Sequence, residues 1–377
     1  MSNLLSWCAA ERDWLRETIE TLVRLESPTT SKSAVDRCGA ELSARLSAIG
    51  AAVRRVAGGT RGDHIVADFS GDERRVMVLG HFDTVWPVGQ LETMPLREEQ
   101  GRLHGPGIFD MKAGIGVAML AMRALAAHPA VARPQVTMVL TTDEEMGSGT
   151  SRGLIEASAR ECQAVLVLEP SLPGGAAKTS RKGCGEYELV VHGVAAHAGV
   201  DPTRGASAIH ELARQILAVE DLQDLDRGIT VNVGVISGGS RTNVVADRAE
   251  ASIDVRVRAM ADAATVDAKL RGLRPSVPGT RLEVTGSVGR PPLERTAQVA
   301  ALFALARQAA RELGQELDEG ATGGGSDGNF TAAVGVPTLD GLGPRGDGAH
   351  ALHEHIQIDD LHWRAAFVAT VLSRIGR

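Results

Sequence analysis

The chain of 377 residues has few cysteines, no long apolar run and no long run of basic residues, and each absence excludes a class of protein. Its four cysteines, Cys8, Cys38, Cys162 and Cys184, are widely scattered and form no CxxC pair, which argues against a zinc knuckle and a disulfide framework. No stretch approaches the roughly 18 continuous apolar residues of a membrane span. Lys and Arg do not cluster as a nucleic-acid footprint requires, and the net charge is -7.

Nucleotide-binding motifs are also missing, because neither GxxxxGK nor a strand followed by GxGxxG occurs. The N-terminal segment, MSNLLSWCAAERDWLRETIETLV, carries acidic residues early and lacks the basic start, apolar stretch and cleavage site of a signal peptide. We therefore expect a cytoplasmic protein whose partners include neither nucleic acid nor membrane.

The composition is that of an ordinary globular protein, with 43% apolar and 23% charged residues. Single hydrophobic cores stop growing at roughly 250 to 300 residues. A chain of this length is therefore expected to form at least two domains.

The first half of the chain alternates short aliphatic runs with helical patterns. Uninterrupted apolar runs of this kind are typical of strands buried on both faces of a largely parallel sheet. The sequence predicts an α/β layer with strands at 76–80, 136–140 and 164–168 and with helices around 14–23, 34–49, 111–125 and 151–160.

From about residue 182 the pattern changes to alternating apolar and polar positions, as in strands with one wet face. EYELVVHG, ITVNVGVIS and AEASIDVRV are the predicted strands of a separate α+β domain, with helices at 204–219 and 262–273. SVGRPPLE at 287–294 is interpreted as an exit linker. The remaining helices, near 296–313 and 360–375, complete the first domain, so the second is an insertion: 1–181 and 292–377 form one domain and 182–291 the other.

Acidic and imidazole residues follow the predicted buried strands, where open α/β sheets bind their ligands. His81 and Asp83 in GHFDTV are two residues apart, so Asp83 can approach the ring of His81 if the strand continues. A carboxylate in that position orients a metal-bound imidazole. The alternative is a strand-end pair satisfied by backbone groups.

Asp110 lies between a glycine-rich turn and a helix in GPGIFDMKAG. It is either a helix N-cap or a ligand, and the glycines favour close approach of the backbone to something bound. Glu144 and Glu145 follow the strand at 136–140, so that one can hold a metal while the other remains free as a base. An acidic first helical turn is the alternative.

Glu169 directly follows the apolar run AVLVL, and a buried charge there requires a partner such as a cation. GAHALHEHIQI offers His350, His353 and His355, of which one is expected to be a ligand. Carboxylates combined with imidazole suit Zn, with Co or Mn as substitutes. Two metals bridged by one carboxylate are the economical arrangement.

Taken in order, GHFDTV, GPGIFDMKAG, TTDEEMGS, LEP, AAHAG, TGGGSDGNF and GAHALHE resemble the motifs of bacterial zinc-dependent glutamate carboxypeptidases that cleave folates. These belong to a larger group of zinc exopeptidases with the aminoacylases, acetylornithine deacetylase and succinyl-diaminopimelate desuccinylase. The resemblance covers roughly residues 10–375. It implies a zinc-exopeptidase-like catalytic domain with an inserted dimerisation lid, and hence a homodimer.

The resemblance also implies a role for each matched residue. His81 and Glu169 would bind one zinc, Glu145 and His350 the other, and Asp110 both. Asp83 would orient His81, and Glu144 would be the general base. The bond from Asp110 to Met111 would be cis. His350 is preferred to His353 and His355 because the family has an acid a few residues after the ligand, and Glu354 meets that requirement.

In the inserted domain, His197 of AAHAG matches a histidine that reaches the partner subunit's site and steadies the oxyanion. Asn243 and Arg290 match positions that hold the substrate's terminal carboxylate. The run at 323–329, with Gly324 as a substrate contact, is compatible with a nest of N–H groups for an anion and equally with a flexible loop. His197 as a loop residue, Asn243 as a turn residue and Arg290 as a linker charge are the ordinary alternatives.

The expected function is hydrolysis of the amide bond to a C-terminal amino acid, with glutamate as the first candidate. The substrate would be a small molecule with a free carboxylate. An N-acyl-amino-acid deacylase of the aminoacylase type is the main alternative. A non-catalytic metal-binding or regulatory protein is the distant one, and the presence of Glu144 beside Glu145 argues against it.

Overall fold

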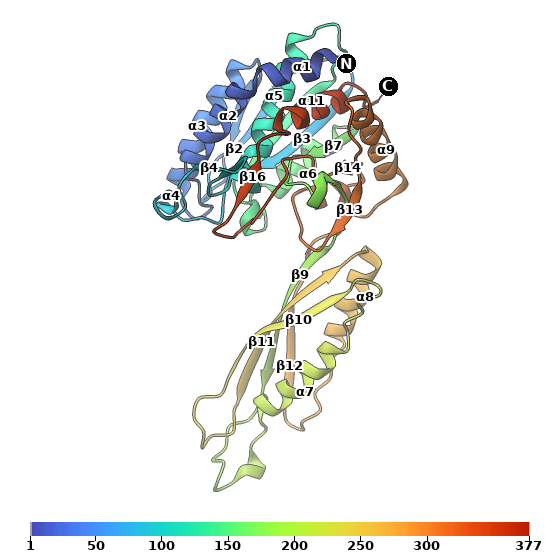
Figure 1. Cartoon of the computed structure of the whole chain (residues 1–377). Helices are drawn as coiled ribbons and strands as arrows, with labels where there is room; N and C mark the ends of the chain where they lie inside the picture. The colour runs from blue at the N-terminus through green and yellow to red at the C-terminus, as the bar shows by residue number, and fades with distance from the viewer. Residues whose placement is uncertain (1, 377) are drawn as a thin grey trace. The chain divides into compact units, whose positions relative to one another are not determined.

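The computed structural model describes residues 2–376, which divide into two compact units (Figure 1). Unit 1 comprises residues up to Thr179, Arg295–Ala321 and residues from Ser326 onward. Unit 2 comprises Ser180–Glu294 and Thr322–Gly325. The sequence pattern predicts that residues 322–325 belong to the first domain, whereas in the structure they belong to unit 2.

A six-stranded sheet with the order β1-β2-β6-β3-β7-β14 forms the centre of unit 1. β6, β3, β7 and β14 are parallel neighbours, whereas β1 and β2 add antiparallel pairs at one edge. The prediction of a mostly parallel sheet is therefore confirmed. The strands are β1 (Ala52–Val56), β2 (His64–Phe69), β3 (Arg75–His81), β6 (Gln135–Thr141), β7 (Ala164–Val167) and β14 (Thr338–Leu339).

Both faces of this sheet are covered, which explains its aliphatic runs. In β3, Val76 and Val78 pack into a large core, and Met77 and Leu79 pack into a second core on the opposite face. The large core includes side chains of α1 (Ser2–Ala10), α2 (Arg12–Arg24), α3 (Lys32–Ala48), α5 (Ala113–Ala127), α9 (Ala297–Glu312) and α11 (Leu361–Leu372). The second core includes side chains of α6 (Arg152–Arg160) and α10 (Gly328–Ala333).

A small antiparallel sheet with the order β15-β16-β5-β4 also belongs to unit 1. Its strands are β4 (Arg97–Glu99), β5 (Arg102–His104), β15 (Gly346–Asp347) and β16 (His355–Gln357). Short elements complete the unit: α4 (Gln90–Thr93), the π-type turn η1 (Ile108–Lys112), and the 3-10 turns η2 (Glu144–Met146) and η3 (Pro173–Gly175). β8 (Ala177–Arg181) and β13 (Glu319–Thr322) contain two of the four points where the chain passes between the units.

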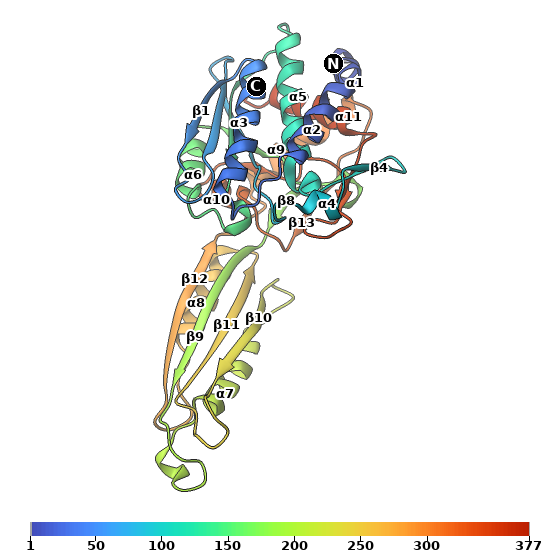
Figure 2. The ribbon, with the colours of Figure 1, turned by 90° about the vertical axis from the view of Figure 1, so that its left-hand side faces the viewer.

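Unit 2 is an antiparallel sheet with the order β10-β11-β9-β12 and two helices (Figure 2). Alternate residues of β9 and β11 are buried against α7 and α8, as the predicted one-sided burial requires. The elements are β9 (Gly183–His192), the 3-10 turn η4 (Pro202–Arg204), α7 (Ala208–Glu220), β10 (Thr230–Gly238), β11 (Arg248–Val257), α8 (Met260–Arg271) and β12 (Arg281–Arg290).

The predicted linker at 287–294 is wrong in its first half, because β12 continues to Arg290. Ser287 still pairs with Glu186, and Arg290 pairs with Cys184 after an irregularity in the register. Gly286 and Gly289 both lie within β12, where a strand with an irregular register tolerates glycine. Among the described residues, no helix is both long enough and apolar enough to cross a membrane.

Candidate metal centre

The predicted metal ligands of unit 1 come from five separate segments. His81 ends β3, Glu145 lies in the turn after β6, and Glu169 follows β7 by two residues. These three strands are parallel neighbours, so their carboxyl ends meet at one edge of the sheet. Asp110 lies in η1 immediately before α5, and His350 lies between β15 and β16.

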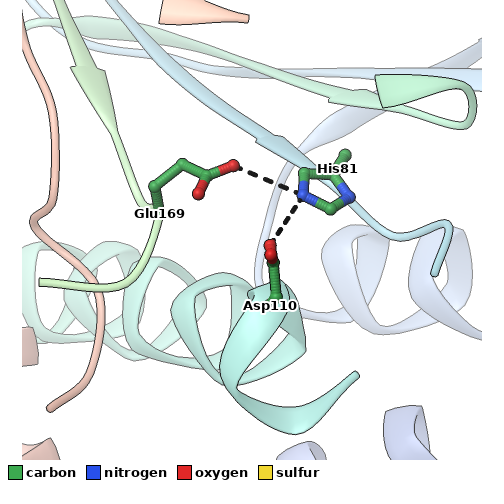
Figure 3. Close-up of side chains that lie close together, drawn as sticks. All are labelled: His81, Asp110 and Glu169. Carbon is green, nitrogen blue, oxygen red and sulfur yellow. Dashed lines mark hydrogen bonds and ion pairs between the residues drawn. The ribbon is translucent and has the colours of Figure 1, made fainter. Parts of the chain in front are cut away.

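The first cluster consists of His81, Asp110 and Glu169 (Figure 3). The Nε2 atom of His81 lies 3.1 Å from an Asp110 oxygen and 3.3 Å from Oε1 of Glu169. His81 and Glu169 are buried, and Asp110 is partly buried. One imidazole nitrogen and two carboxylate oxygens therefore converge on one point, as zinc ligands do.

The second cluster consists of Asp110, Glu145 and His350. The Nε2 atom of His350 lies 3.1 Å from Oε2 of Glu145 and 3.6 Å from Oδ2 of Asp110. Asp110 directs Oδ1 to His81 and Oδ2 to His350, so each of its oxygens belongs to a different cluster. This geometry fits two metal ions that share one carboxylate.

His353 and His355 do not join either cluster among the described residues. The Nδ1 atom of His355 lies 2.9 Å from the carbonyl of His353, and its ring lies beside that of His104. The side chain of His353 is exposed, with 64% of its surface accessible. The preference for His350 among the three histidines therefore agrees with the geometry.

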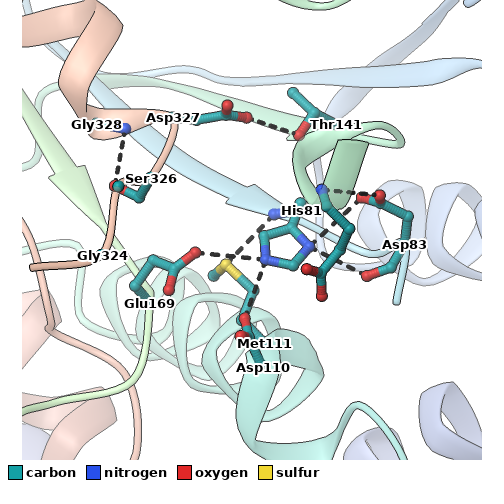
Figure 4. Close-up of polar contacts among 12 residues, drawn as sticks. His81, Asp83, Asp110, Met111, Thr141, Glu169, Gly324, Ser326, Asp327 and Gly328 are labelled. Carbon is teal, nitrogen blue, oxygen red and sulfur yellow. Dashed lines mark hydrogen bonds and ion pairs between the residues drawn. The ribbon is translucent and has the colours of Figure 1, made fainter. Parts of the chain in front are cut away.

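Asp83 lies on the other side of the His81 ring (Figure 4). The Nδ1 atom of His81 is 3.1 Å from the backbone carbonyl of Asp83 and 3.4 Å from its Oδ1 atom. The fully buried carboxylate also accepts hydrogen bonds from the hydroxyl of Thr29, at 2.7 Å, and from the amide of Glu145, at 3.3 Å. A proton on Nδ1 would face these oxygens and leave the Nε2 lone pair for a metal.

The charged groups of the two clusters shift one another's pKa values. Burial alone would lower the pKa of His81, but its contacts with Asp110, Asp83 and Glu169 raise it well above the ordinary value. Contacts with Asp110 and Glu145 raise the pKa of His350 to about 10. Burial raises the pKa of Glu145. The carboxylates therefore favour the protonated form of both imidazoles, and metal ions would compete with those protons for the same nitrogens.

The segment around Asp110 has the backbone features that the motif suggested, with one difference. The peptide bond from Asp110 to Met111 is cis, as the resemblance implied. The close approach at Gly114, however, is to another segment of the chain and not to a bound group. A Cβ atom there would lie 2.0 Å from the carbonyl oxygen of Leu168. The helix predicted from Met111 begins at Ala113 instead, because Asp110 and Met111 have non-helical backbone angles.

Glu144 begins η2, next to Glu145 of the second cluster, and is partly buried. Next to this turn lies a polar network that was not predicted from the sequence. Asp327 accepts hydrogen bonds from the hydroxyls of Thr141, at 2.9 Å, and Ser148. Figure 4 includes the contact between Asp327 and Thr141. The hydroxyl groups in TTDEEMGS were the available signal, since buried hydroxyls require partners.

The predicted substrate contacts of unit 2 form two separate groups. The amide of Ala198 donates to the carbonyl of Asn243, at 3.0 Å, so Asn243 lies against the exposed turn that carries His197. At the opposite end of the sheet, Arg290 pairs with Cys184. There the guanidinium of Arg181 donates to the carbonyls of Gly324 and Gly325, at 3.2 and 3.0 Å.

The ten residues of β9 separate these two groups. His192, at one end, pairs with Arg248 and Arg281, near the loop of Asn243, while Cys184 pairs with Arg290 at the other end. A strand of this length spans about 30 Å. A single unit 2 therefore does not bring Asn243 and Arg290 together on one carboxylate, and the predicted roles of both residues stay predictions.

Comparison with known proteins agrees with the geometry of unit 1. Carboxypeptidase G2 from Pseudomonas sp. (strain RS-16) is 29% identical to this chain over 368 residues, which cover 96% of this chain and 89% of that protein. Acetylornithine deacetylase from Myxococcus xanthus is 34% identical over 191 residues, covering 47% of this chain and 48% of that protein.

Solved structures with the same fold include the aminopeptidase PepT from Bacillus cereus ATCC 10987. It has a TM-score of 0.80 at 21% identity, with 97% of this chain and 99% of that chain covered. The sequence profile described as Peptidase family M20/M25/M40 matches residues 77–374. This match spans most of the chain and both metal-ligand clusters, so the protein belongs to peptidase family M20/M25/M40 and is a metal-dependent hydrolase.

Proposed function

We propose that the protein is a two-zinc hydrolase that cleaves the amide bond to a C-terminal amino acid, with glutamate as the first candidate. The observation that carries this proposal is the position of Asp110, whose two oxygens belong to two ligand clusters, with Glu144 adjacent to the ligand Glu145. Mixed imidazole and carboxylate ligands favour zinc, and Co or Mn are the expected substitutes.

In the proposed mechanism, two metal ions would be held by His81, Asp110, Glu145, Glu169 and His350, and they would supply Lewis acidity for water activation and for polarisation of the amide carbonyl. Glu144 accepts the proton of the attacking water and delivers it to the leaving amine. His197 donates a hydrogen bond to the oxyanion. Arg290 binds the substrate's terminal carboxylate through two parallel hydrogen bonds. Asp83 holds the ring of His81 in the orientation that exposes Nε2.

The separation of the two groups in unit 2 supports a homodimer in which His197 and Asn243 act in the partner's site. β10 is an edge strand, and Val235 and Ile236 on it are 63% and 62% exposed. Leu217 on α7 is 64% exposed. An open edge beside exposed apolar side chains is suited to pairing with a second copy.

Cleavage at a C-terminal amino acid is supported by the relative carboxypeptidase G2, which resembles this chain over nearly its whole length. The glutamate preference follows from the resemblance of the motifs to glutamate carboxypeptidases. The alternative of an N-acyl-amino-acid deacylase is supported by the relative acetylornithine deacetylase, although that match covers only half of each protein. Both reactions would use the same metal ligands and the same base. The two candidate functions are therefore distinguished by the substrates that the protein hydrolyses and not by its metal centre.

The test is hydrolysis of two substrate sets by zinc-loaded protein, one of peptidyl and acyl glutamates and one of N-acetyl amino acids. We expect glutamate release from the first set, and a 10²- to 10⁴-fold loss of turnover in Glu144→Gln. The matched control is Glu161→Gln, which changes an exposed glutamate of unit 1. Turnover confined to the second set would favour the deacylase, and unchanged turnover in Glu144→Gln would refute the assigned base.

The cross-subunit role is tested by coexpressing Glu144→Gln with His197→Ala. Each homodimer is expected to be inactive, whereas a mixed dimer keeps one complete site, so a random mixture should regain about a quarter of wild-type activity. A chain carrying both substitutions is the control. Failure of the mixture to regain activity would contradict action in the partner's site.

A further inference from the structure

Glu354 is a fully buried carboxylate that belongs to neither ligand cluster. Its Oε2 atom accepts hydrogen bonds from the indole N–H of Trp86, at 2.7 Å, and from the amide of Gly107, at 2.9 Å. Its Oε1 atom accepts from the amides of Phe109, at 2.8 Å, and Asp110, at 3.1 Å. All four partners are donors, so both oxygens act only as acceptors.

Three of these donors are backbone amides of the turn that ends at Asp110. A carboxylate that receives three amides from four successive residues determines where that piece of backbone lies. Gly107, within the turn, has the left-handed backbone angle φ of 69°. The side chain of Glu354 therefore holds the segment from which the shared ligand Asp110 extends.

The same residue lies four positions after the ligand His350. Here the chain makes two successive tight turns: the amide of Ala351 donates to the carbonyl of Gly348 across the turn that contains His350, and the amide of Glu354 donates to the carbonyl of Ala351 across the next turn. The backbone of Glu354 thus closes the turn directly after that of His350, while its side chain accepts the amides of the turn that ends at Asp110. Two ligand segments that are far apart in sequence are joined through one residue.

We propose that Glu354 is a positioning residue for the metal pair, which holds Asp110 where its two oxygens reach both metals. The inference rests on the metal pair of the proposed function, but it does not depend on the substrate. Glutamine has nearly the same shape as glutamate, but only one acceptor oxygen. Its amide group would face N–H donors, so Glu354→Gln should release part of the turn and displace Asp110.

A matched control in unit 2 distinguishes a positioning role of Glu354 from a role in stability alone. Glu211 is also a fully buried glutamate. It accepts from the amides of Val277, at 2.6 Å, and Ser276, at 3.0 Å, and from the side chain of Gln215, at 2.5 Å. Glu211→Gln introduces the same donor conflict without touching the turn of Asp110.

The experiment measures metal binding directly, by competition with a chelator and by the visible spectrum of Co²⁺-loaded protein, together with unfolding of the metal-free protein. We expect both variants to be less stable than wild type. Only Glu354→Gln should bind metal 10- to 100-fold more weakly and show an altered Co²⁺ spectrum. If Glu354→Gln fails to fold, Trp86→Phe removes one of the four donors and should weaken metal binding in the same direction, by less.

Wild-type metal affinity and an unchanged spectrum in Glu354→Gln would overturn the inference, as would wild-type affinity in Trp86→Phe when Glu354→Gln cannot be purified. Equal loss of affinity in Glu211→Gln would also overturn it, because a general loss of stability would then be the cause. Weakened metal binding in Glu354→Gln alone, together with no turnover of any substrate by wild type, would support the positioning role and refute the proposed function.

Discussion

Replacing Gly114 by alanine should disrupt the metal centre from outside its ligands. Gly114 lies in the first turn of α5, four residues after Asp110, and faces the carbonyl of Leu168, which precedes Glu169. The added Cβ would lie 2.0 Å from that oxygen, whereas real Cβ contacts are essentially never shorter than 3.0 Å. Because the oxygen belongs to the backbone, it cannot rotate away. The helix and the strand end must separate by about 1 Å, the difference of these distances.

Two opposing effects determine how much Gly114→Ala changes the free energy of unfolding. Alanine is favoured over glycine within a helix by about 0.5–1 kcal/mol. Forcing an extra group into a packed interior costs typically 1–3 kcal/mol, and more where the backbone must move. The clash therefore dominates, and we expect Gly114→Ala to lower the free energy of unfolding by about 1–2 kcal/mol. A displacement of 1 Å also exceeds the roughly 0.2 Å tolerance of metal–ligand distances. The cluster of His81, Asp110 and Glu169 should therefore lose affinity.

Gly153→Ala is the control, because Gly153 lies in the first turn of α6 and a Cβ there meets nothing within 4 Å. This control should be as stable as wild type or slightly more stable. The measurements are urea unfolding of the metal-free proteins and metal content after dialysis. The reasoning would be refuted if Gly114→Ala matched Gly153→Ala in stability and retained two metals per chain.

Three further predictions concern metal, pH and the independence of the units. Chelation should lower the melting temperature, because a ligand at 100 times its Kd adds about 2.7 kcal/mol to the stability of the folded state; equal melting curves with and without chelator would contradict a preformed site. Burial lowers the pKa of His64 below its ordinary 6.5, so below that pH the unfolded chain binds a proton that the folded chain does not, and stability falls. Because the raised pKa values of Glu354 and Glu145 act in the opposite direction, the measurement is the difference in unfolding free energy between wild type and His64→Gln, which should shift against wild type as the pH falls from 7 to 5. Leu189→Ala, in the core of unit 2, should destabilise that unit by about 2–5 kcal/mol in calorimetry without changing metal affinity.

The α/β core could be predicted because its signal is local. β3 carries Val76 to Leu79 without a polar residue, and both cores of unit 1 take alternate members of this run. β9 and β11 bury only alternate residues, and their sequences alternate accordingly. The end of β12 could not be predicted in this way, since glycines in a strand with an irregular register resemble a linker.

The metal ligands could be proposed from the sequence for a related reason. An acid or imidazole directly after a buried apolar run is conspicuous, and parallel strands bring such positions together. His81 and Glu169 satisfy this rule. The distance between Asn243 and Arg290 could not be predicted from the sequence. It depends on the end of β9 at which each residue lies, and the pairing of the strands determines this.

The groups that position the ligands were the least predictable part of the site, and the reason is chemical. A ligand is recognised by its side chain, whereas Glu354 acts on backbone amides, which every residue except proline possesses. Gly114 acts through the absence of a side chain opposite a carbonyl. Neither leaves a motif of its own beyond an acid after a histidine and a glycine two residues after a lysine. The ligand set can therefore be inferred from the sequence, while its geometry depends on backbone contacts that only the fold reveals.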